Sequence, residues 1–396
     1  MTKETKKNWR LKYERMEGAL VDVTSPFSDV IRSSSPSANF IYGNTWGLPR
    51  GYSEVLYGIP KSGKSLFARM KIGQLHQDNP EAIAVVFDTE FRWRGQLNAE
   101  SASAYGIDLD RLWVFEGNSP MLIFDRIEKD LSAMSQDGCP IYYIIIDSIT
   151  GIMGKREMNA ESVEVTQIGD NALTIQTGLK RILGPIRKNK FACTLITQAR
   201  AELDQWEIKK GNKIKMQASF GLQHFAEWFI MVSPNSSKEG RTDLLGNEFI
   251  NDEVTDLMDK GENTGHKIRV VVKDASMGPK GRTGEFTLDR KRGVINQHEE
   301  VLRLGINRGV IAQAGAWLTF DGVRYQGKRE FLSALIQQKG LQEEVIRQLM
   351  ERDKRGEFAA MDKADEEANA TELFLDKEET LTETAETAET TYEESL

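Results

Sequence analysis

The sequence has few cysteines and histidines and no long apolar run. Cys139 and Cys193 are the only cysteines in the 396 residues, and each lies beside an apolar segment. The histidines, which show no spacing typical of metal ligands, are His76, His224, His266 and His298. We therefore expect reduced thiols and neither a disulfide framework nor a His/Cys metal site. No stretch approaches the ~20 apolar residues of a membrane span, and the charged start lacks a signal-peptide pattern, so we expect a cytoplasmic protein without a membrane partner.

Charge is distributed unevenly along the chain. The formal net charge is −8, yet residues 362–396 hold 13 acidic residues against two lysines, which leaves the rest mildly basic. A basic body with an acidic tail suits a protein that binds nucleic acid and carries its own electrostatic competitor. It equally suits a soluble protein with a solubilising tail, and charge alone leaves both readings open.

The most informative stretch is GIPKSGKS at residues 58–65, which has the spacing G-x-x-x-x-G-K-S. An apolar run precedes it and a helix-like segment, 66–75, follows, which is the strand, glycine loop and helix N-terminus that phosphate binding needs. A glycine-rich surface turn would leave the Lys-Ser pair unexplained. We predict that Lys64 reaches the β- and γ-phosphates of ATP and that the Ser65 hydroxyl holds Mg²⁺. The loop residues expected to contact ATP are Gly58, Pro60, Lys61, Ser62, Gly63, Lys64 and Ser65.

From this loop onward, buried strands alternate with helices. The pattern predicts a mostly parallel sheet with helices on both faces, an α/β P-loop ATPase core with ligands at the carboxyl ends of its strands. A later strand pairs with a hairpin partner. The predicted strands cover 82–87, 112–115, 140–146, 191–196, 225–232, 267–272 and 284–288, and the predicted helices cover 120–134 and 169–187.

Three strand ends beside the loop carry residues suited to nucleotide hydrolysis. Asp147 follows the most apolar strand and is predicted to be a second Mg²⁺ ligand, against the alternative of a turn aspartate. Glu90 lies at the end of a neighbouring strand and is suited to deprotonate the attacking water, against the alternative of a salt-bridged glutamate. Gln198 can hydrogen-bond the γ-phosphate, an assignment that the residues alone support only weakly.

Two loops leave the predicted sheet on the nucleotide side, at about 150–168 and 200–220. The second interleaves basic and aromatic residues, a composition suited to single-stranded DNA, although nearby carboxylates dilute its charge. Composition alone also allows plain solvated connections. The residues predicted to bind DNA are Lys155, Arg156, Arg200, Trp206, Lys209, Lys210, Lys213, Lys215 and Phe220.

Composition divides the chain into four regions. Residues 1–30 form an arm too small to fold alone, which packs on its own core or on a neighbouring copy. Residues 31–294 form the core, with a long polar segment of undetermined role at 233–266. Residues 295–358 read as a helix, turn and helix around Gly315-Ala-Trp, a small α/β domain. The low-complexity acidic tail, 359–396, is predicted to be disordered because it cannot bury enough apolar area.

These motifs resemble those of the RecA family of homologous-recombination ATPases, including phage relatives of the UvsX type, over nearly the whole chain. Residues 87–90 are similar to the segment with the catalytic glutamate, and 197–200 to the glutamine switch that opens the second DNA-binding loop. The other matching stretches are 47–51 and 54–58 before the phosphate loop, 105–110, 146–149, 168–170 at the end of the first DNA-binding loop, 270–273, and 315–317 in the C-terminal domain.

The resemblance implies roles for several residues. Lys64, Glu90 and Gln198 would serve hydrolysis in their own chain, and Lys273 would reach across a protomer interface to a neighbour's ATP. Bacterial RecA has two such lysines two residues apart. Here Ala275 stands at the second position, which leaves Lys280 or Arg282 as substitutes. About four extra residues after Glu90 leave the adenine contacts unassigned.

The resemblance also implies a function and its partners. It implies ATP and Mg²⁺ as cofactors, a helical filament on single-stranded DNA, strand exchange with duplex DNA, and contacts with a single-strand-binding protein and a loader. The location would be the bacterial cytosol or nucleoid, or the gene would come from a phage. The alternatives are a ring helicase or motor of the same fold and a regulatory ATP-binding protein. A ring helicase would have a helical collar and a basic finger, where this chain has a short arm and Lys273.

Overall fold

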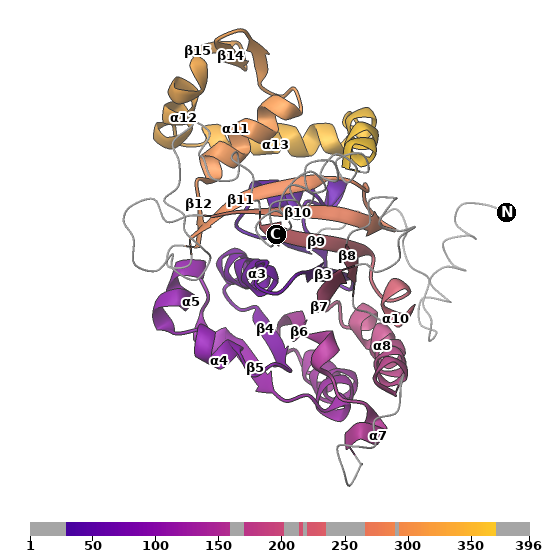
Figure 1. The fold of residues 1–396 in the computed structure, drawn as a ribbon. Helices are drawn as coiled ribbons and strands as arrows, with labels where there is room; N and C mark the ends of the chain where they lie inside the picture. The colour runs from indigo at the N-terminus through magenta and orange to yellow at the C-terminus, as the bar shows by residue number, and fades with distance from the viewer. Residues whose placement is uncertain are drawn as a thin grey trace, which may run out of the picture.

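A ten-stranded sheet forms the centre of the molecule (Figure 1). The computed structural model describes residues 29–158, 170–201, 214–216, 220–234, 266–289 and 293–369. The main strands follow the order β12-β11-β10-β9-β3-β7-β6-β4-β5, and β8 pairs with β7. Six neighbouring strands are parallel: β3 (Ser53–Gly58), β4 (Ile83–Asp88), β5 (Leu112–Glu116), β6 (Ile141–Asp147), β7 (Ala192–Ala201) and β9 (Trp228–Pro234). The antiparallel extension comprises β10 (His266–Ala275), β11 (Thr283–Asp289) and β12 (Gly293–Ile295), and β8 (Ile214–Met216) is also antiparallel to its partner.

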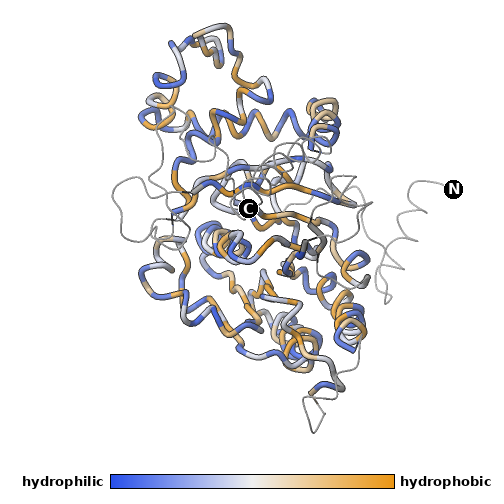
Figure 2. The backbone as a smooth tube through the Cα atoms, in the orientation of Figure 1, coloured by the Kyte–Doolittle hydropathy of each residue, from blue (hydrophilic) through white to orange (hydrophobic). Residues whose placement is uncertain are grey.

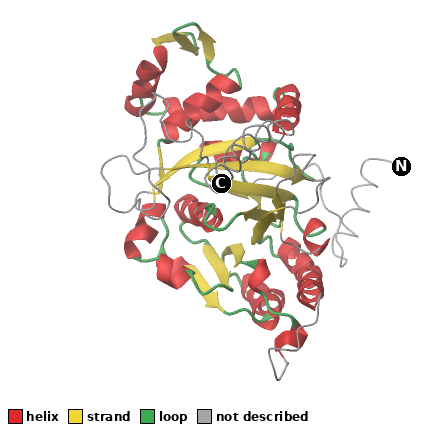
Figure 3. Cartoon of the chain, viewed as in Figure 1, coloured by secondary structure: helices red, strands yellow, loops and turns green. Residues whose placement is uncertain are grey.

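Helices cover both faces of this sheet because its strands are apolar on both faces. Alternate residues of β3 enter different hydrophobic clusters, Leu56 on the side of α3 (Lys64–Asp78) and Val55 on the side of α8 (Asp170–Lys188). In Figure 2, hydrophobic segments concentrate on the strands and on the helix surfaces turned toward them. Figure 3 shows the same layering as yellow strands between red helices. The predicted α/β core is therefore confirmed.

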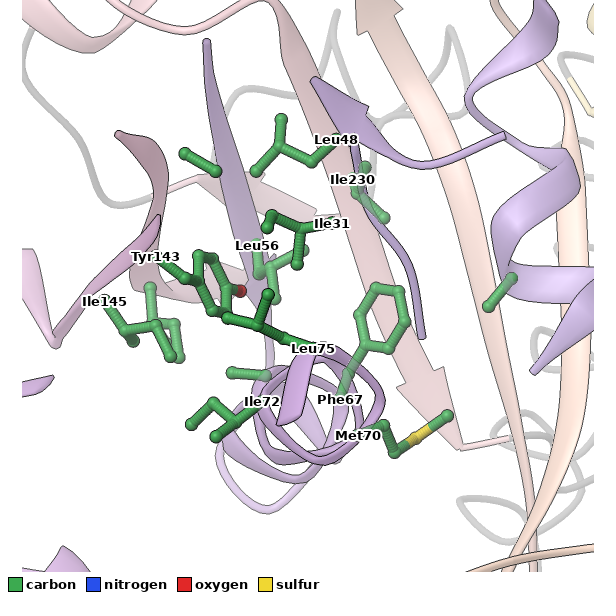
Figure 4. Close-up of a cluster of buried hydrophobic side chains, with 14 of the residues drawn as sticks. Ile31, Leu48, Leu56, Phe67, Met70, Ile72, Leu75, Tyr143, Ile145 and Ile230 are labelled. Carbon is green, nitrogen blue, oxygen red and sulfur yellow. The ribbon is translucent and has the colours of Figure 1, made fainter. Parts of the chain in front are cut away.

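Helix α3, which begins inside the phosphate loop, is fixed by the first of these clusters. Leu75 points toward Leu56 and Tyr143 of the sheet, as Figure 4 shows, and Ile72 belongs to the same buried cluster. These side chains are at most 4% exposed. Beside them lies a buried ion pair between Lys71 of α3 and Glu54 of β3. These contacts hold α3 to β3, and the phosphate loop lies between these two elements.

The two helices predicted after the phosphate loop, 120–134 and 169–187, fall close to their predicted positions, and the shorter helices of the core were not predicted. Residues 120–134 form a helix as predicted, with π-helical hydrogen bonding over Met121–Leu131 (η3) and α-helical bonding over α6 (Ser132–Gln136). The shorter helices are α4 (Trp93–Gln96), α5 (Ala99–Tyr105), α7 (Lys155–Met158) and α10 (Phe220–Gln223), with one-turn helices η2 (Leu109–Arg111) and η4 (Ile149–Gly151). Both cysteines are free thiols, and Cys193 is buried in β7.

The small C-terminal domain is α/β, as predicted, and a sheet takes the place of the turn in the predicted helix, turn and helix. Between α11 (Gln297–Asn307) and α12 (Gly327–Gln337) lies an antiparallel sheet of three strands, and α13 (Leu341–Lys354) follows α12. Its strands are β13 (Ala312–Ala314), β14 (Trp317–Phe320) and β15 (Val323–Gln326). The domain's core includes Phe40 and Trp46 from the N-terminal segment that holds α2 (Pro36–Phe40) and η1 (Gly43–Thr45). Because this core is shared, the domain is anchored to the ATPase core.

The beginning of the acidic tail is ordered, which corrects the prediction of disorder from residue 359. Residues 359–369 are helical, and Asp362 and Asp365 of this helix pair with Arg282 and Arg308. Composition analysis missed this because the helix is held by specific ion pairs rather than by buried apolar area. Residues 370–396 lie outside the described part of the chain.

Other predicted regions are described only in part. The N-terminal arm is described from residue 29, where β1 (Val30–Ile31) pairs with β2 (Leu48–Pro49). Most of the polar segment 233–266 lies outside the described residues. Within the described ranges, no helix combines the length and the apolar character that crossing a bilayer requires.

Candidate functional site

The loop between β3 and α3 has the curled backbone that its glycines predict. Gly63 has a φ of +97°, and a Cβ added there would lie 2.5 Å from Ile268 Cδ1 of β10. Lys61 also has a positive φ, 64°. Positive φ favours glycine and lets consecutive N–H groups converge on one point, the geometry of a phosphate cradle. Gly58 ends β3, and residues 60–65 line the cavity beside it.

Lys64 lies inside this cradle. Its Nζ donates hydrogen bonds to the carbonyl oxygens of Gly58 (3.0 Å) and Ile59 (2.8 Å). Burial lowers the pKa of Lys64, and the nearby carboxylates of Asp147 and Glu90 oppose that shift. A buried cation whose carbonyl partners are neutral is well placed to exchange them for charged phosphate oxygens.

Ser65 and Asp147, the two predicted metal ligands, are in direct contact. Ser65 Oγ donates to Asp147 Oδ2 across 2.7 Å, and Trp93 Nε1 donates to the same oxygen across 2.8 Å. Burial raises the pKa of Asp147, while these two hydrogen bonds lower it. A hydroxyl and a carboxylate oxygen at the same point form the hard-oxygen donor set that Mg²⁺ prefers, so the residues present fit the ion.

Glu90 lies beside the ends of β4 and β6 and beside Gln198, which is within β7 because that strand extends past its predicted end at residue 196 to Ala201. Glu90 Oε1 accepts from Ser148 Oγ (2.9 Å) after β6 and from Gln198 Nε2 (3.2 Å) in β7. Its Oε2 pairs with Arg92 across 2.8 Å. Buried Asp88 fixes the turn, because its carboxylate accepts from the backbone N–H groups of Glu90 (3.1 Å) and Trp93 (2.7 Å). The structure therefore brings Glu90 and Gln198 together, and their roles as base and sensor stay predictions.

These groups line one cavity of about 530 Å³, large enough for a nucleoside triphosphate. The cavity runs from the phosphate loop past the carboxylates to α4 and α5, where Gln96, Asn98 and Ser101 line it. Sequence reasoning missed this end and also missed Trp93. These residues belong to the stretch after Glu90 whose extra length prevented assignment. The only signal in the sequence for a role of Trp93 was that its indole N–H donor follows closely after a strand that ends in acidic residues.

The candidate DNA-binding residues are described in part. Arg200 is exposed in β7, and the register places its backbone opposite Lys215 of β8, so the second loop begins and ends as a hairpin. Lys155 and Arg156 begin α7, and Phe220 begins α10. Both of these short helices pack on α8, which brings the ends of the two loops to one helix. The candidates outside the described residues are Trp206, Lys209, Lys210 and Lys213.

Lys273 lies away from this chain's own phosphate loop. Ile268 of β10 touches the loop at Gly63, and Lys273 is five residues further along the strand, about 17 Å at ~3.4 Å per residue. That is farther than a lysine side chain extends, and Lys273 does not line the cavity. It occupies a β-bulge in the pairing of β10 with β9, a device that redirects a side chain.

The two proposed substitutes for a second lysine have other partners. Arg282 is 1% exposed and is held by Asp353 and Asp362, so it cannot reach a neighbouring protomer, and that suggestion is wrong. Lys280 is half exposed and pairs with Asp274 across 2.6 Å.

Comparison with known proteins agrees with this geometry. Residues 19–247 match the sequence profile of the RecA N-terminal domain. The chain is 25% identical over 329 residues to Protein RecA of Mycoplasmopsis pulmonis, covering 82% of this chain and 86% of that protein. It is 22% identical over 306 residues to Protein RecA of Aquifex pyrophilus, with 77% and 78% covered. It is 23% identical over 323 residues to Protein RecA of Porphyromonas gingivalis, with 82% and 84% covered.

Proposed function

This chain belongs to the RecA family, and from that premise we propose that it is a DNA recombinase: an ATPase, stimulated by single-stranded DNA, that assembles on it as a helical filament and exchanges strands with duplex DNA. The observation that carries the proposal is that Lys64, Glu90 and Gln198 line one cavity. Gln198 belongs to β7, and this strand continues toward the second candidate DNA loop.

The cavity residues have separate roles in hydrolysis. Lys64 binds the β- and γ-phosphates, and Ser65 with Asp147 would hold Mg²⁺, which would neutralise charge on the phosphate oxygens. Glu90 accepts the proton of the attacking water at one of its carboxylate oxygens, Oε1 or Oε2. The hydrogen bond from its backbone N–H to Asp88 fixes where Glu90 lies. Arg92, paired with Glu90, gives up this partner when a triphosphate adds negative charge beside it.

Gln198 links this chemistry to DNA. Its amide contacts Glu90, and β7 continues from it through Arg200 to Ala201 without interruption. A γ-phosphate that accepts a hydrogen bond from the Gln198 amide therefore shifts β7. The carboxyl end of this strand is where the basic loop begins. Stabilisation of that loop by DNA acts back on Gln198 by the same route, because coupling between two sites is reciprocal.

Lys273 makes the site dependent on a second copy of the chain. It lies about 17 Å along β10 from its own phosphate loop, so any contact of its charge with a triphosphate requires the triphosphate of a neighbour. A contact of one surface with a different surface of the next copy is heterologous and builds an open helix. ATP is then enclosed between protomers, and hydrolysis loosens the filament.

The experiment that tests the proposal measures ATP hydrolysis with and without single-stranded DNA and images the complexes. Stimulated hydrolysis together with helical filaments supports it. Closed rings that unwind duplex would instead identify a ring helicase, and hydrolysis indifferent to DNA would identify a regulatory ATPase.

The finer parts of this proposal concern partners and location. Single-stranded DNA is the first substrate and duplex DNA is the second. A single-strand-binding protein competes for the single-stranded DNA, and a loader protein helps this chain to bind it. The filament acts in recombination, repair and recombination-dependent replication in a bacterial cytoplasm or nucleoid, whether the gene is bacterial or phage-borne.

A further inference from the structure

Arg282 has every side-chain donor occupied. Its guanidinium donates to both oxygens of Asp353 (2.8 and 2.6 Å) and to both oxygens of Asp362 (2.7 Å each). The remaining donor goes to the carbonyl of Phe40 across 2.9 Å, and the group lies 4.1 Å from the centre of that ring. These five hydrogen bonds use every donor that an arginine side chain has. Arg282 therefore joins the turn before β11 to α13 and to the helix at 359–369.

The helix at 359–369 lies directly on the turn that joins β10 to β11. A Cβ added to Gly281 would be 2.4 Å from the Cα of Glu366, so only glycine permits this approach. Asn369 Nδ2 donates to the carbonyl of Gly281 across 2.6 Å, and its Oδ1 accepts from Arg269 of β10 across 2.8 Å. The helix therefore contacts both strands of the hairpin.

The same hairpin carries Lys273. Val272 exchanges backbone hydrogen bonds with the turn: its N–H donates to Arg282 O (3.0 Å), and its carbonyl accepts from Gly281 N–H (2.8 Å). Lys273 is the next residue, at the β-bulge. The path from the carboxylate of Asp362 to the backbone beside Lys273 thus passes through one residue, Arg282.

We propose that residues 359–369 form an intramolecular clamp that holds the β10–β11 hairpin and thereby positions Lys273 for the triphosphate of the neighbouring protomer. Asp362 and Arg282 are positioning residues in this device. The inference rests on the proposed trans role of Lys273. It makes the start of the acidic tail a part of the hydrolytic machinery rather than a spacer.

Opening the clamp affects its two arginines differently. Asp353 alone still neutralises Arg282 when Asp362 leaves, whereas Arg308, which is 7% exposed, loses both Asp362 and Asp365, so opening has a cost at Arg308. The Asp362 side chain is 14% exposed and that of Asp365 is 38% exposed, against 5% for Asp353. The solvent-accessible half of the junction is the half that belongs to the tail.

Hydrogen exchange in the full-length, nucleotide-free protein tests the clamp itself. In Asp362→Asn/Asp365→Asn, peptides covering 272–282 should exchange about tenfold faster than in the unaltered chain. Asp376→Asn/Glu378→Gln removes the same two charges beyond residue 369 and should leave exchange unchanged. Equal exchange in all three proteins would overturn the clamp, and acceleration in both variants would assign the effect to net charge instead.

A double-mutant cycle with Lys273→Ala tests the positioning. The clamp variant should lower the DNA-stimulated kcat, keep the KM for ATP within about twofold, and cause no further loss when added to Lys273→Ala. Losses that multiply would show that the clamp acts elsewhere and would overturn the inference. Normal stimulated turnover in Lys273→Ala alone would instead remove the proposed trans role, an outcome that the exchange measurement does not depend on.

Discussion

Gln198 Nε2 donates a hydrogen bond to Glu90 Oε1 across 3.2 Å, although the two residues come from strands separated by β6. The side chain proposed to sense the γ-phosphate therefore already contacts the side chain proposed to activate water. Ser148, which follows the intervening strand, donates to the same oxygen. Any event that moves β7 changes the surroundings of the Glu90 carboxylate.

The first prediction is that Gln198→Ala separates hydrolysis from its stimulation by DNA. The variant keeps Lys64, Ser65 and Glu90, so its rate without DNA should stay within a few-fold of the original. Its rate with saturating single-stranded DNA should fall roughly tenfold, which corresponds to about 1.4 kcal/mol of transition-state stabilisation. Steady-state phosphate release measures both rates.

Two further variants make that result specific. Gln136→Ala removes an exposed glutamine of α6 and should change neither rate. Glu90→Gln should lower hydrolysis by about 10²–10⁴-fold with and without DNA, because a general base is lost, whereas Glu116→Gln at the exposed end of β5 should not. Full DNA stimulation in Gln198→Ala would contradict the coupling.

The second prediction is that two inactive variants complement each other. Lys64→Ala lacks phosphate binding in its own cavity, and Lys273→Ala lacks the charge given to a neighbour, so each alone should hydrolyse ATP poorly on DNA. In a mixed filament, a Lys273→Ala protomer next to a Lys64→Ala protomer has one complete site between them. Mixing should therefore restore part of the DNA-stimulated rate.

The stoichiometry dependence provides the check. Titrating one variant into the other at fixed total protein should give a maximum near equal amounts. A double variant, Lys64→Ala/Lys273→Ala, cannot supply a complete site with Lys64→Ala and should not complement it. A rate that only averages the two single variants would rule out the trans contribution.

The parts of this site that could be predicted from sequence are those with local signals. The phosphate loop is contiguous, and Asp147 ends an apolar strand that periodicity identifies. Trp93 could not be assigned, because its hydrogen bond to Asp147 joins residues 54 positions apart and depends on how one turn folds. Arg282 was misjudged for the same reason. Its proximity to Lys273 in sequence suggested a second reaching cation, while its partners come from α13 and the tail.

Polar groups inside the core are the other feature that sequence could not predict. Glu54 stands within a strand read as apolar, and Lys71 within the helix after the loop, yet both side chains are fully buried. Tyr42 and Thr194 donate to the carboxylate of Glu54, with the Thr194 bond at 2.6 Å. Such a network requires four segments that are distant in sequence to meet, and no short sequence pattern predicts it.

The third prediction concerns the stability given by this pair. Lys71→Met leaves the Glu54 carboxylate buried without its cation and should lower the free energy of unfolding by about 3–5 kcal/mol. Lys71→Met/Glu54→Leu removes both charges and should be more stable than Lys71→Met alone. Urea unfolding followed by circular dichroism measures the differences.

The comparison needs a surface lysine as its control. Lys129 pairs with Asp125 on the exposed side of η3, and Lys129→Met should leave the unfolding midpoint nearly unchanged. If the double variant were less stable than Lys71→Met, the pair would contribute through packing and shape rather than through charge compensation.

The fourth prediction is a pH dependence of stability from Glu300 of α11. This carboxyl group is 3% exposed and accepts from Ser35 Oγ and from Ser37 N–H (3.1 Å), which joins the C-terminal domain to the start of α2. Burial raises its pKa from 4.5 to about 8, and the hydrogen bonds and Arg303 oppose the shift.

The sign of this dependence follows from which state holds the proton. Between about pH 4.5 and 8 the folded chain keeps a proton on Glu300 that the unfolded chain releases. Stability should therefore fall as pH rises through this window, by at most about 1.4 kcal/mol per pH unit for one group, and level off above it. Glu300→Gln keeps an acceptor for Ser35 and Ser37 without a titrating group, so its advantage over the unaltered chain should grow from pH 5 to pH 8. Urea unfolding at several pH values measures that difference, with Glu343→Gln, at an exposed position of α13, as the control. A constant difference between Glu300→Gln and the unaltered chain would mean that Glu300 titrates in the folded protein as it does in the unfolded one.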